Sequence, residues 1–181
     1  YFAACGISVV NTLVRKGVLE FYLKETYRAP VKERPAQDTG KIHLTDEQQM
    51  AFERLLTQYE TGGGISLLYG VTGSGKTQVF MRLADEVLKQ GRAVLVMVPE
   101  ISLTPQTLNL FYRRYGGQVA VIHSGLSLGE RLDEWKRIKN GQAKVIVGTR
   151  SAVFAPCEDL GLIILDEEQE HTYKSESSPR F

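Results

Sequence analysis

The sequence of 181 residues predicts an α/β fold with a mostly parallel sheet and helices on both faces. Short, continuous apolar runs such as "AVLVMV" and "LIIL" alternate with helical patterns from Leu44 onward. Runs of this kind are typical of strands buried on both faces of a sheet. A glycine-rich loop follows the first such run, residues 65–69, and an acidic pair follows the last, "LIIL". Both lie at predicted strand ends, where open α/β sheets bind ligands.

The first 41 residues differ in composition from the rest. They predict a helix over 7–15, a strand over 18–23 and a linker over 29–41, which holds two prolines and few apolar residues. The later pattern is regular and predicts one domain over 42–181. Its expected helices are 46–59, 76–90, 104–115 and 128–139, and its expected strands are 65–69, 93–98, 118–123, 143–148 and 161–165.

The stretch "YGVTGSGKTQVF", residues 69–80, fits the P-loop pattern G-x-x-x-x-G-K-[ST] between a predicted strand and a predicted helix. Small residues allow backbone N–H groups to approach phosphate oxygens closely, where the helix N-terminus adds positive potential. Lys76 is expected to reach the β- and γ-phosphates of ATP, and the Thr77 hydroxyl to ligate Mg²⁺. The expected nucleotide-binding residues are Gly70, Thr72, Gly73, Ser74, Gly75, Lys76 and Thr77.

The stretch "LIILDEEQ", residues 162–169, supplies the second half of such a site. Four apolar residues end in Asp166 at the carboxyl edge of a predicted buried strand. Asp166 is expected to hold Mg²⁺ through water, and Glu167 to polarise the attacking water. Lys76, Asp166 and Glu167 are therefore the predicted catalytic residues.

Composition limits the remaining possibilities. Lysine and arginine number 22 against 21 aspartate and glutamate, so any nucleic-acid contact requires a local patch. Cys5 and Cys157 are far apart without ligand spacing, which predicts reduced thiols, a cytoplasmic protein and no zinc within this sequence. No apolar run approaches bilayer length, so no membrane contact is expected. The first residue is not Met and the last ones form a polar stretch, which predicts a piece of a longer protein.

Five blocks in order resemble the bacterial replication-restart helicases of superfamily 2, the PriA or primosomal protein N′ family. The blocks are "LLYGVTGSGKTQVF", "VMVPEISLTPQ", "HSGLSLGERLDEWKRIKNG", "VIVGTRSAVFAP" and "LGLIILDEEQEHTYK". The resemblance implies that 42–181 is a RecA-like first motor lobe ending just after motif II. It also implies that 1–28, with "GISVVNTLVRKGVLEF", is the end of a winged-helix domain. One difference is that Gln169 and Glu170 precede His171, where the family usually has His-Asp directly after Asp-Glu-Glu, so a coupling role for Gln169 stays open.

The resemblance further implies that the parent protein is an ATP-dependent 3′→5′ DNA helicase of replication restart and primosome assembly. Single-stranded and forked DNA, other primosome proteins and single-strand binding protein are the implied partners. The second lobe with its arginine fingers, and the zinc-binding cysteines, would lie outside this sequence, so the lobe alone is expected to hydrolyse ATP near background. "VPEISLTPQ" and "GTRSAVF" resemble the motifs that grip a single-strand backbone. Their expected DNA contacts are Ser102, Thr104, Gln106, Thr149, Arg150 and Ser151.

Several residues have a second interpretation. Gln48 could pair with the adenine edge, or it could complete a capping box with Thr45. Thr104 could be a helix N-cap and Arg150 a surface ion pair. The tail 171–181 could be an aromatic DNA-contacting loop or a disordered end. Trp135 is expected to pack in the core, on the helix 128–139.

Two other functions stay open. A P-loop phosphotransferase would need an arginine-rich lid and an acceptor pocket, and neither pattern is visible in the sequence. A non-catalytic DNA-binding module would have kept the P-loop only as a scaffold.

Overall fold

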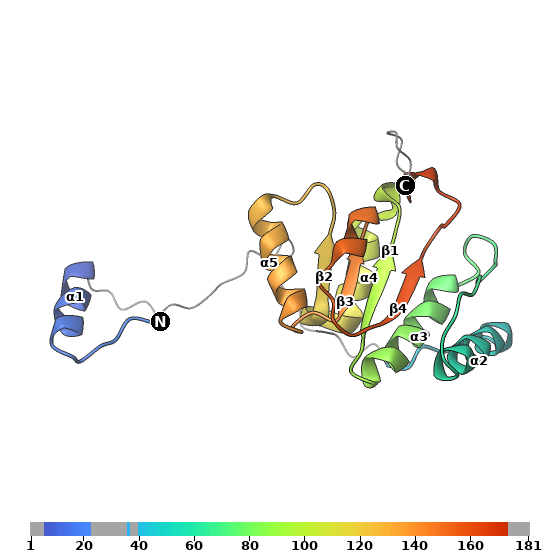
Figure 1. The fold of residues 1–181 in the computed structure, drawn as a ribbon, viewed down its shortest axis with the longest axis horizontal. Coiled ribbons are helices and arrows are strands. Elements are labelled where there is room, and N and C mark those ends of the chain that lie inside the picture. Colours follow the sequence, from blue (N-terminus) through green and yellow to red (C-terminus); the bar gives the residue numbers. More distant parts are fainter. Residues whose placement is uncertain (1–5, 23–35, 37–39, 174–181) are drawn as a thin grey trace.

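The computed structural model describes residues 6–22, 36 and 40–173, which contain five α-helices, four strands and four short 3₁₀ helices (Figure 1). In chain order they are α1 (Ile7–Arg15), α2 (Asp46–Glu60), α3 (Lys76–Lys89), β1 (Ala93–Met97), η1 (Glu100–Ser102), α4 (Pro105–Tyr115), η2 (Gly116–Gln118), β2 (Val119–Ile122), α5 (Leu128–Lys139), β3 (Val145–Gly148), η3 (Arg150–Phe154), β4 (Leu160–Leu165) and η4 (His171–Tyr173).

The four strands form one parallel sheet in the order β2-β3-β1-β4. Val96 of β1 lies opposite Val147 of β3 on one side and Ile164 of β4 on the other. β1, β2 and β3 are buried along their whole length, which agrees with the continuous apolar runs of the sequence. Because the strands are parallel, all their carboxyl ends meet at one edge of the sheet, the upper edge in Figure 1.

Helices cover both faces of the sheet, as the sequence predicts. On one face, apolar side chains of α3 and α4 pack on alternate residues of the strands, with Phe80, Phe111 and Val121 among them. On the other face, α5 and η3 cover the intervening residues, with Ile138 and Ile146 at the centre. In Figure 1, α5 lies beside β2, and α2 and α3 lie at the β4 end. The prediction of an α/β fold is confirmed.

The predicted strand 65–69 does not form. This stretch has no strand partner among the described residues, and Ile65 and Tyr69 are almost fully exposed. Leu68 alone packs inward, against a cluster of α2 and α3 side chains that Leu162 also joins. The prediction of a strand here is wrong, because an apolar run forms a strand only where a neighbouring backbone completes its hydrogen bonds.

The N-terminal predictions are met only in part. α1 has the bounds that the sequence predicts but contributes no buried side chain. The predicted strand 18–23 is absent over residues 18–22, and residue 23 lies outside the described residues, as does most of the linker 29–41. Residues 18–22 are exposed and have no partner strand within the described chain, so their apolar pattern does not produce pairing. The winged-helix assignment stays a prediction.

No helix in the part of the chain that the structure describes is both long enough and apolar enough to cross a bilayer.

Candidate nucleotide site

The glycine-rich loop 70–75 leads directly into α3, with Gly75 as the residue before its first turn. Gly75 has φ 78°, a left-handed conformation that an L-residue with a side chain adopts at a cost. At Gly70, a Cβ atom would lie 2.7 Å from Ser74 Oγ, closer than real contacts allow. The loop therefore fits a backbone cradle at a helix N-terminus, which is the shape that phosphate binding requires.

Lys76 is the first residue of α3, and its ammonium group lies inside the loop. Its Nζ donates hydrogen bonds to the carbonyl oxygens of Gly70, at 2.6 Å, and Val71, at 3.1 Å. Thr77 follows in the same helical turn and is half-buried. The loop thus places a cation and a hydroxyl at the positions where a triphosphate and its metal ion would need them.

Gln48 lies against this loop from the first turn of α2. Its Nε2 donates to the carbonyl oxygen of Ser74 at 2.9 Å, and its Oε1 accepts from the backbone N–H of Thr45 at 2.9 Å. The Thr45 side chain caps the helix in return, so the predicted capping box is confirmed. The Ser74 contact is one that the sequence did not indicate, because the two residues belong to separate elements.

Asp166 and Glu167 directly follow β4, at the carboxyl edge of the sheet. The backbone N–H of Asp166 donates to the carbonyl of Met97 at 2.9 Å and so continues the pairing of β4 with β1. Burial raises the pKa of the Asp166 carboxyl, while the positive charge of Lys76 acts in the opposite direction. Lys76 is therefore close enough to Asp166 for their charges to interact, as one site requires.

Glu167 has an unusual backbone and a defined partner. It is the one non-glycine residue with positive φ, 51°, in the described part of the chain. Its Oε2 accepts a hydrogen bond from Ser102 Oγ at 2.9 Å, and its N–H donates to Asp166 Oδ1 at 3.1 Å. Holding a non-glycine residue in this backbone conformation costs about 1–3 kcal/mol of strain, and such residues occur most often at functional sites.

Tyr173 is a site residue that the sequence did not single out in this role. Its hydroxyl lies 2.7 Å from the carbonyl oxygen of Asp166 and 3.0 Å from that of Met97. Burial raises the pKa of the Tyr173 phenol, so the hydroxyl stays a hydrogen-bond donor. Residues 171–173 thus form a short helix that supports the acidic loop. The rest of the predicted DNA-contacting tail, 174–181, lies outside the described residues.

The residues predicted to contact DNA lie after the carboxyl ends of β1 and β3. Ser102 ends η1, and Gln106 is exposed in the first turn of α4. Thr104 is the N-cap of α4, because its hydroxyl accepts from the backbone N–H of Thr107 at 3.2 Å. Arg150 and Ser151 are exposed in η3. Thr149 is only 2% exposed, so its hydroxyl does not belong to the accessible surface of this track.

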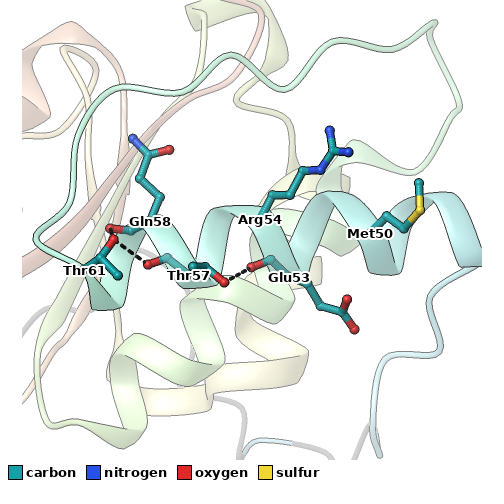
Figure 2. Close-up of a pocket in the computed structure, with 6 residues that line it drawn as sticks. All are labelled: Met50, Glu53, Arg54, Thr57, Gln58 and Thr61. Carbon is teal, nitrogen blue, oxygen red and sulfur yellow. Dashed lines mark hydrogen bonds between the residues drawn. The ribbon is translucent and has the colours of Figure 1, made fainter.

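A surface hollow lies elsewhere, along α2 (Figure 2). Its lining residues all belong to this helix or follow it: Met50, Glu53, Arg54, Thr57, Gln58 and Thr61. The hydroxyls of Thr57 and Thr61 each donate to a carbonyl one turn earlier, at 2.8 Å. These two hydroxyls are already bonded within the helix, and none of the residues of the nucleotide site lines this hollow.

The site's residues fit Mg²⁺ bound together with a nucleotide. Among the described residues, no group of three or more histidine, cysteine, aspartate or glutamate side chains could hold a metal ion alone. Magnesium commonly keeps several waters and takes only one or two protein ligands plus phosphate oxygens. Thr77 and Asp166 offer a hydroxyl and a carboxylate of that kind.

The comparisons with known proteins agree with this geometry. Replication restart protein PriA of Bacillus subtilis is 47% identical over 96% of this chain, that of Synechocystis is 42% identical over 94%, and that of Treponema pallidum is 48% identical over 79%. The chain covers 22%, 20% and 22% of these relatives, so it spans about a fifth of their length.

A solved structure shares the fold. The SWI2/SNF2 ATPase core of Sulfolobus solfataricus, solved in complex with double-stranded DNA, superposes with a TM-score of 0.52 at 21% identity. The match covers 82% of this chain and 29% of that one. The parallel sheet with its P-loop is therefore a RecA-like lobe. The family described as type III restriction enzyme, res subunit, matches residues 41–178, and the chain belongs to this family.

Proposed function

We propose that this chain is the ATP-binding first motor lobe of a DNA helicase that acts in replication restart. The observation that carries the proposal is the presence of two complementary motifs in one fold: the cradle with Lys76 at the N-terminus of α3, and the pair Asp166 and Glu167 at the carboxyl end of β4. The similarity to PriA over nearly the whole chain supports the same assignment. The proposal includes a 3′→5′ direction of unwinding and a cytoplasmic location. It also includes forked DNA, primosome proteins and single-strand binding protein as partners of the full-length protein.

Each site residue has a distinct task in the proposed reaction. Lys76 neutralises the charge of the β- and γ-phosphates, and the loop's N–H groups hold their oxygens. Thr77 and Asp166 hold Mg²⁺, which shields phosphate charge when bound. Glu167 orients the attacking water and accepts its proton. The arginine fingers that complete such sites come from a second lobe in the proposed full-length protein.

The calorimetric test compares ATP·Mg²⁺ binding by the native chain and by Lys76→Ala. The variant should lose measurable binding, because no other cation lies inside the loop among the described residues. Lys89→Ala is the matched control: it removes a lysine from the far end of the same helix, where Nζ pairs with Glu86, and binding should stay unchanged. Equal affinity for the native chain and Lys76→Ala would overturn the nucleotide site.

The hydrolysis test belongs to the full-length protein. Glu167→Gln should keep ATP binding but lower DNA-stimulated hydrolysis by about 10²- to 10⁴-fold, the usual contribution of a general base. Glu168→Gln changes the same charge at the next, exposed residue and should hydrolyse ATP normally. A phosphotransferase would instead need an acceptor molecule for turnover. A non-catalytic module that keeps the P-loop as a scaffold would hydrolyse no ATP, with or without DNA.

A further inference from the structure

Ser102 links two loops that are 65 residues apart in the sequence. It ends η1, just after β1, whereas Glu167 follows β4, the neighbouring strand. The hydroxyl of Ser102 donates to Glu167 Oε2 at 2.9 Å. The loop after β1 is therefore bonded directly to the residue that is proposed to activate water.

Glu167 is held in place mainly by local bonds. Its backbone has φ 51°, and within the described residues its N–H bonds to Asp166 and its carbonyl oxygen to Glu170. The side chain of Glu167 accepts a hydrogen bond from Ser102 in the loop after β1. Glu167 is exposed, so the Ser102 bond ties an otherwise solvent-facing carboxylate to η1.

The hydroxyl of a serine has one hydrogen to donate. The Ser102 hydroxyl can donate it to the Glu167 carboxylate or to a phosphate oxygen of a bound strand, but not to both. Both acceptors are anionic, and bonds to charged acceptors are about twice as strong as neutral ones. Strand binding at Ser102 and the restraint of Glu167 therefore compete for one donor.

We propose that Ser102 is a positioning residue that couples strand binding to hydrolysis. Without DNA, Ser102 holds the Glu167 carboxylate toward η1 and away from the attacking water. When a phosphate of single-stranded DNA takes the hydroxyl's hydrogen, Glu167 is released for proton transfer. This inference rests on the proposed function of the chain as an ATP-driven DNA motor.

Coupling is reciprocal, which gives a test that needs no hydrolysis. In the full-length protein, Glu167→Ala should tighten binding of a labelled oligo-dT by about three- to tenfold, since the strand no longer competes for Ser102. In a Ser102→Ala background, the same change should give no gain. Glu168→Ala removes an equal charge at the next residue and controls for general electrostatics. Fluorescence anisotropy at fixed salt measures all five proteins.

The kinetic arm measures ATP hydrolysis with and without oligo-dT. Ser102→Ala should raise the DNA-free rate about three- to tenfold and shrink the stimulation by DNA, and Ser102→Thr should restore both. Ser124→Ala is the matched control, because its hydroxyl bonds to Glu100 of η1 rather than to Glu167.

Each arm has an outcome that overturns the coupling. One is an affinity gain from Glu167→Ala that persists without Ser102 or equals that of Glu168→Ala. Another is a DNA-free rate in Ser102→Ala that is unchanged or lower. A failure of the proposed function gives a different result: Lys76→Ala would still bind nucleotide, while the oligo-dT affinities of the Glu167 and Ser102 variants could still be measured. Absence of any single-strand binding would overturn both.

Discussion

Gln48 contacts the phosphate loop from a residue 26 positions earlier in the chain. Both polar atoms of its amide are engaged: Nε2 donates to Ser74, and Oε1 accepts from Thr45. An amide used in this way supports the loop, because one of its N–H groups and one oxygen lone pair are held in bonds within the protein. The structure therefore favours a loop-supporting role over adenine recognition.

This role predicts how nucleotide affinity responds at the residue scale. Gln48→Ala should weaken ATP and GTP binding by a similar factor, about five- to tenfold for one lost hydrogen bond. Gln49→Ala is the control, since Gln49 Nε2 bonds to Glu53 on the surface of α2. Calorimetry with both nucleotides measures the effect. A loss confined to ATP would instead establish Gln48 as the adenine-reading residue.

α5 presents a buried ion pair to the sheet beside the apolar Ile138. Glu134 is fully buried and Arg137 is 4% exposed, whereas the predicted core residue Trp135 is 38% exposed, so that prediction is wrong. Arg137 bonds to Glu134 at 2.8 Å and to the carbonyl of Gly117 at 2.7 Å. Glu134 in turn accepts from the N–H of Val121 at 3.1 Å, which ties α5 to β2.

Removing one partner of this buried pair should destabilise the protein strongly. Arg137→Ala is expected to lower the free energy of unfolding by about 3–5 kcal/mol at neutral pH, because it leaves the buried Glu134 carboxylate without its counter-charge. Lys139→Ala, on the outer face of the same helix near the Trp135 ring, should cost within about 0.5 kcal/mol. Urea denaturation measures both values.

The pH dependence of this loss has a definite sign. Burial raises the pKa of Glu134, so its contribution to stability is greatest below its unfolded pKa and declines as pH rises through the folded pKa. Without Arg137 the folded pKa rises further, and the protonated acid needs no counter-charge. The deficit of Arg137→Ala should therefore shrink between about pH 7 and about pH 5. A deficit that stays constant would contradict this account.

At the scale of the molecule, the sheet has an open side at β4, which is one of its two edge strands. Ile163 and Leu165, on the face that continues Leu95 and Met97 of β1, are 51% and 48% exposed. The other edge of β4 has no partner strand among the described residues. Ile65, Leu67 and Tyr69 of the apolar stretch 65–69 are also exposed. Exposed apolar edges of this kind favour pairing with another chain.

The open side predicts self-association of the chain at high concentration. Ile163→Lys should keep the chain monomeric, because a charge on an edge strand opposes pairing. Leu128→Lys is the control: Leu128 is 83% exposed on α5, away from this edge, and association should persist. Sedimentation velocity over a concentration series measures the average mass. A monomer at all concentrations for the native chain would show that β4 is protected in solution.

The sequence by itself determined the features that depend on local signals. Helix 128–139 has the predicted bounds, because a Ser127 capping box starts it and helical periodicity carries it. The buried strands β1, β2 and β3 were predictable from apolar runs. The same reasoning predicted β4 to be buried on both faces, which is wrong, because Ile163 and Leu165 lie on a face that is left half-exposed. The P-loop and Asp166 were predictable from residue types that phosphate and Mg²⁺ chemistry requires. The position of Asp166 at the carboxyl end of its strand was also predictable. The expected strand before the P-loop, 65–69, does not form, so the prediction that the P-loop follows a strand of the sheet is wrong.

Only the tertiary structure decided which distant groups meet. The bonds of Ser102 to Glu167, Gln48 to Ser74 and Tyr173 to Asp166 each join separate elements, so no local pattern specifies them. The structure also placed Glu134 and Arg137 inside and left 65–69 without a partner strand. The physical reason is common to all of these: burial and hydrogen bonding are properties of neighbours in space, and a sequence pattern records only neighbours along the chain.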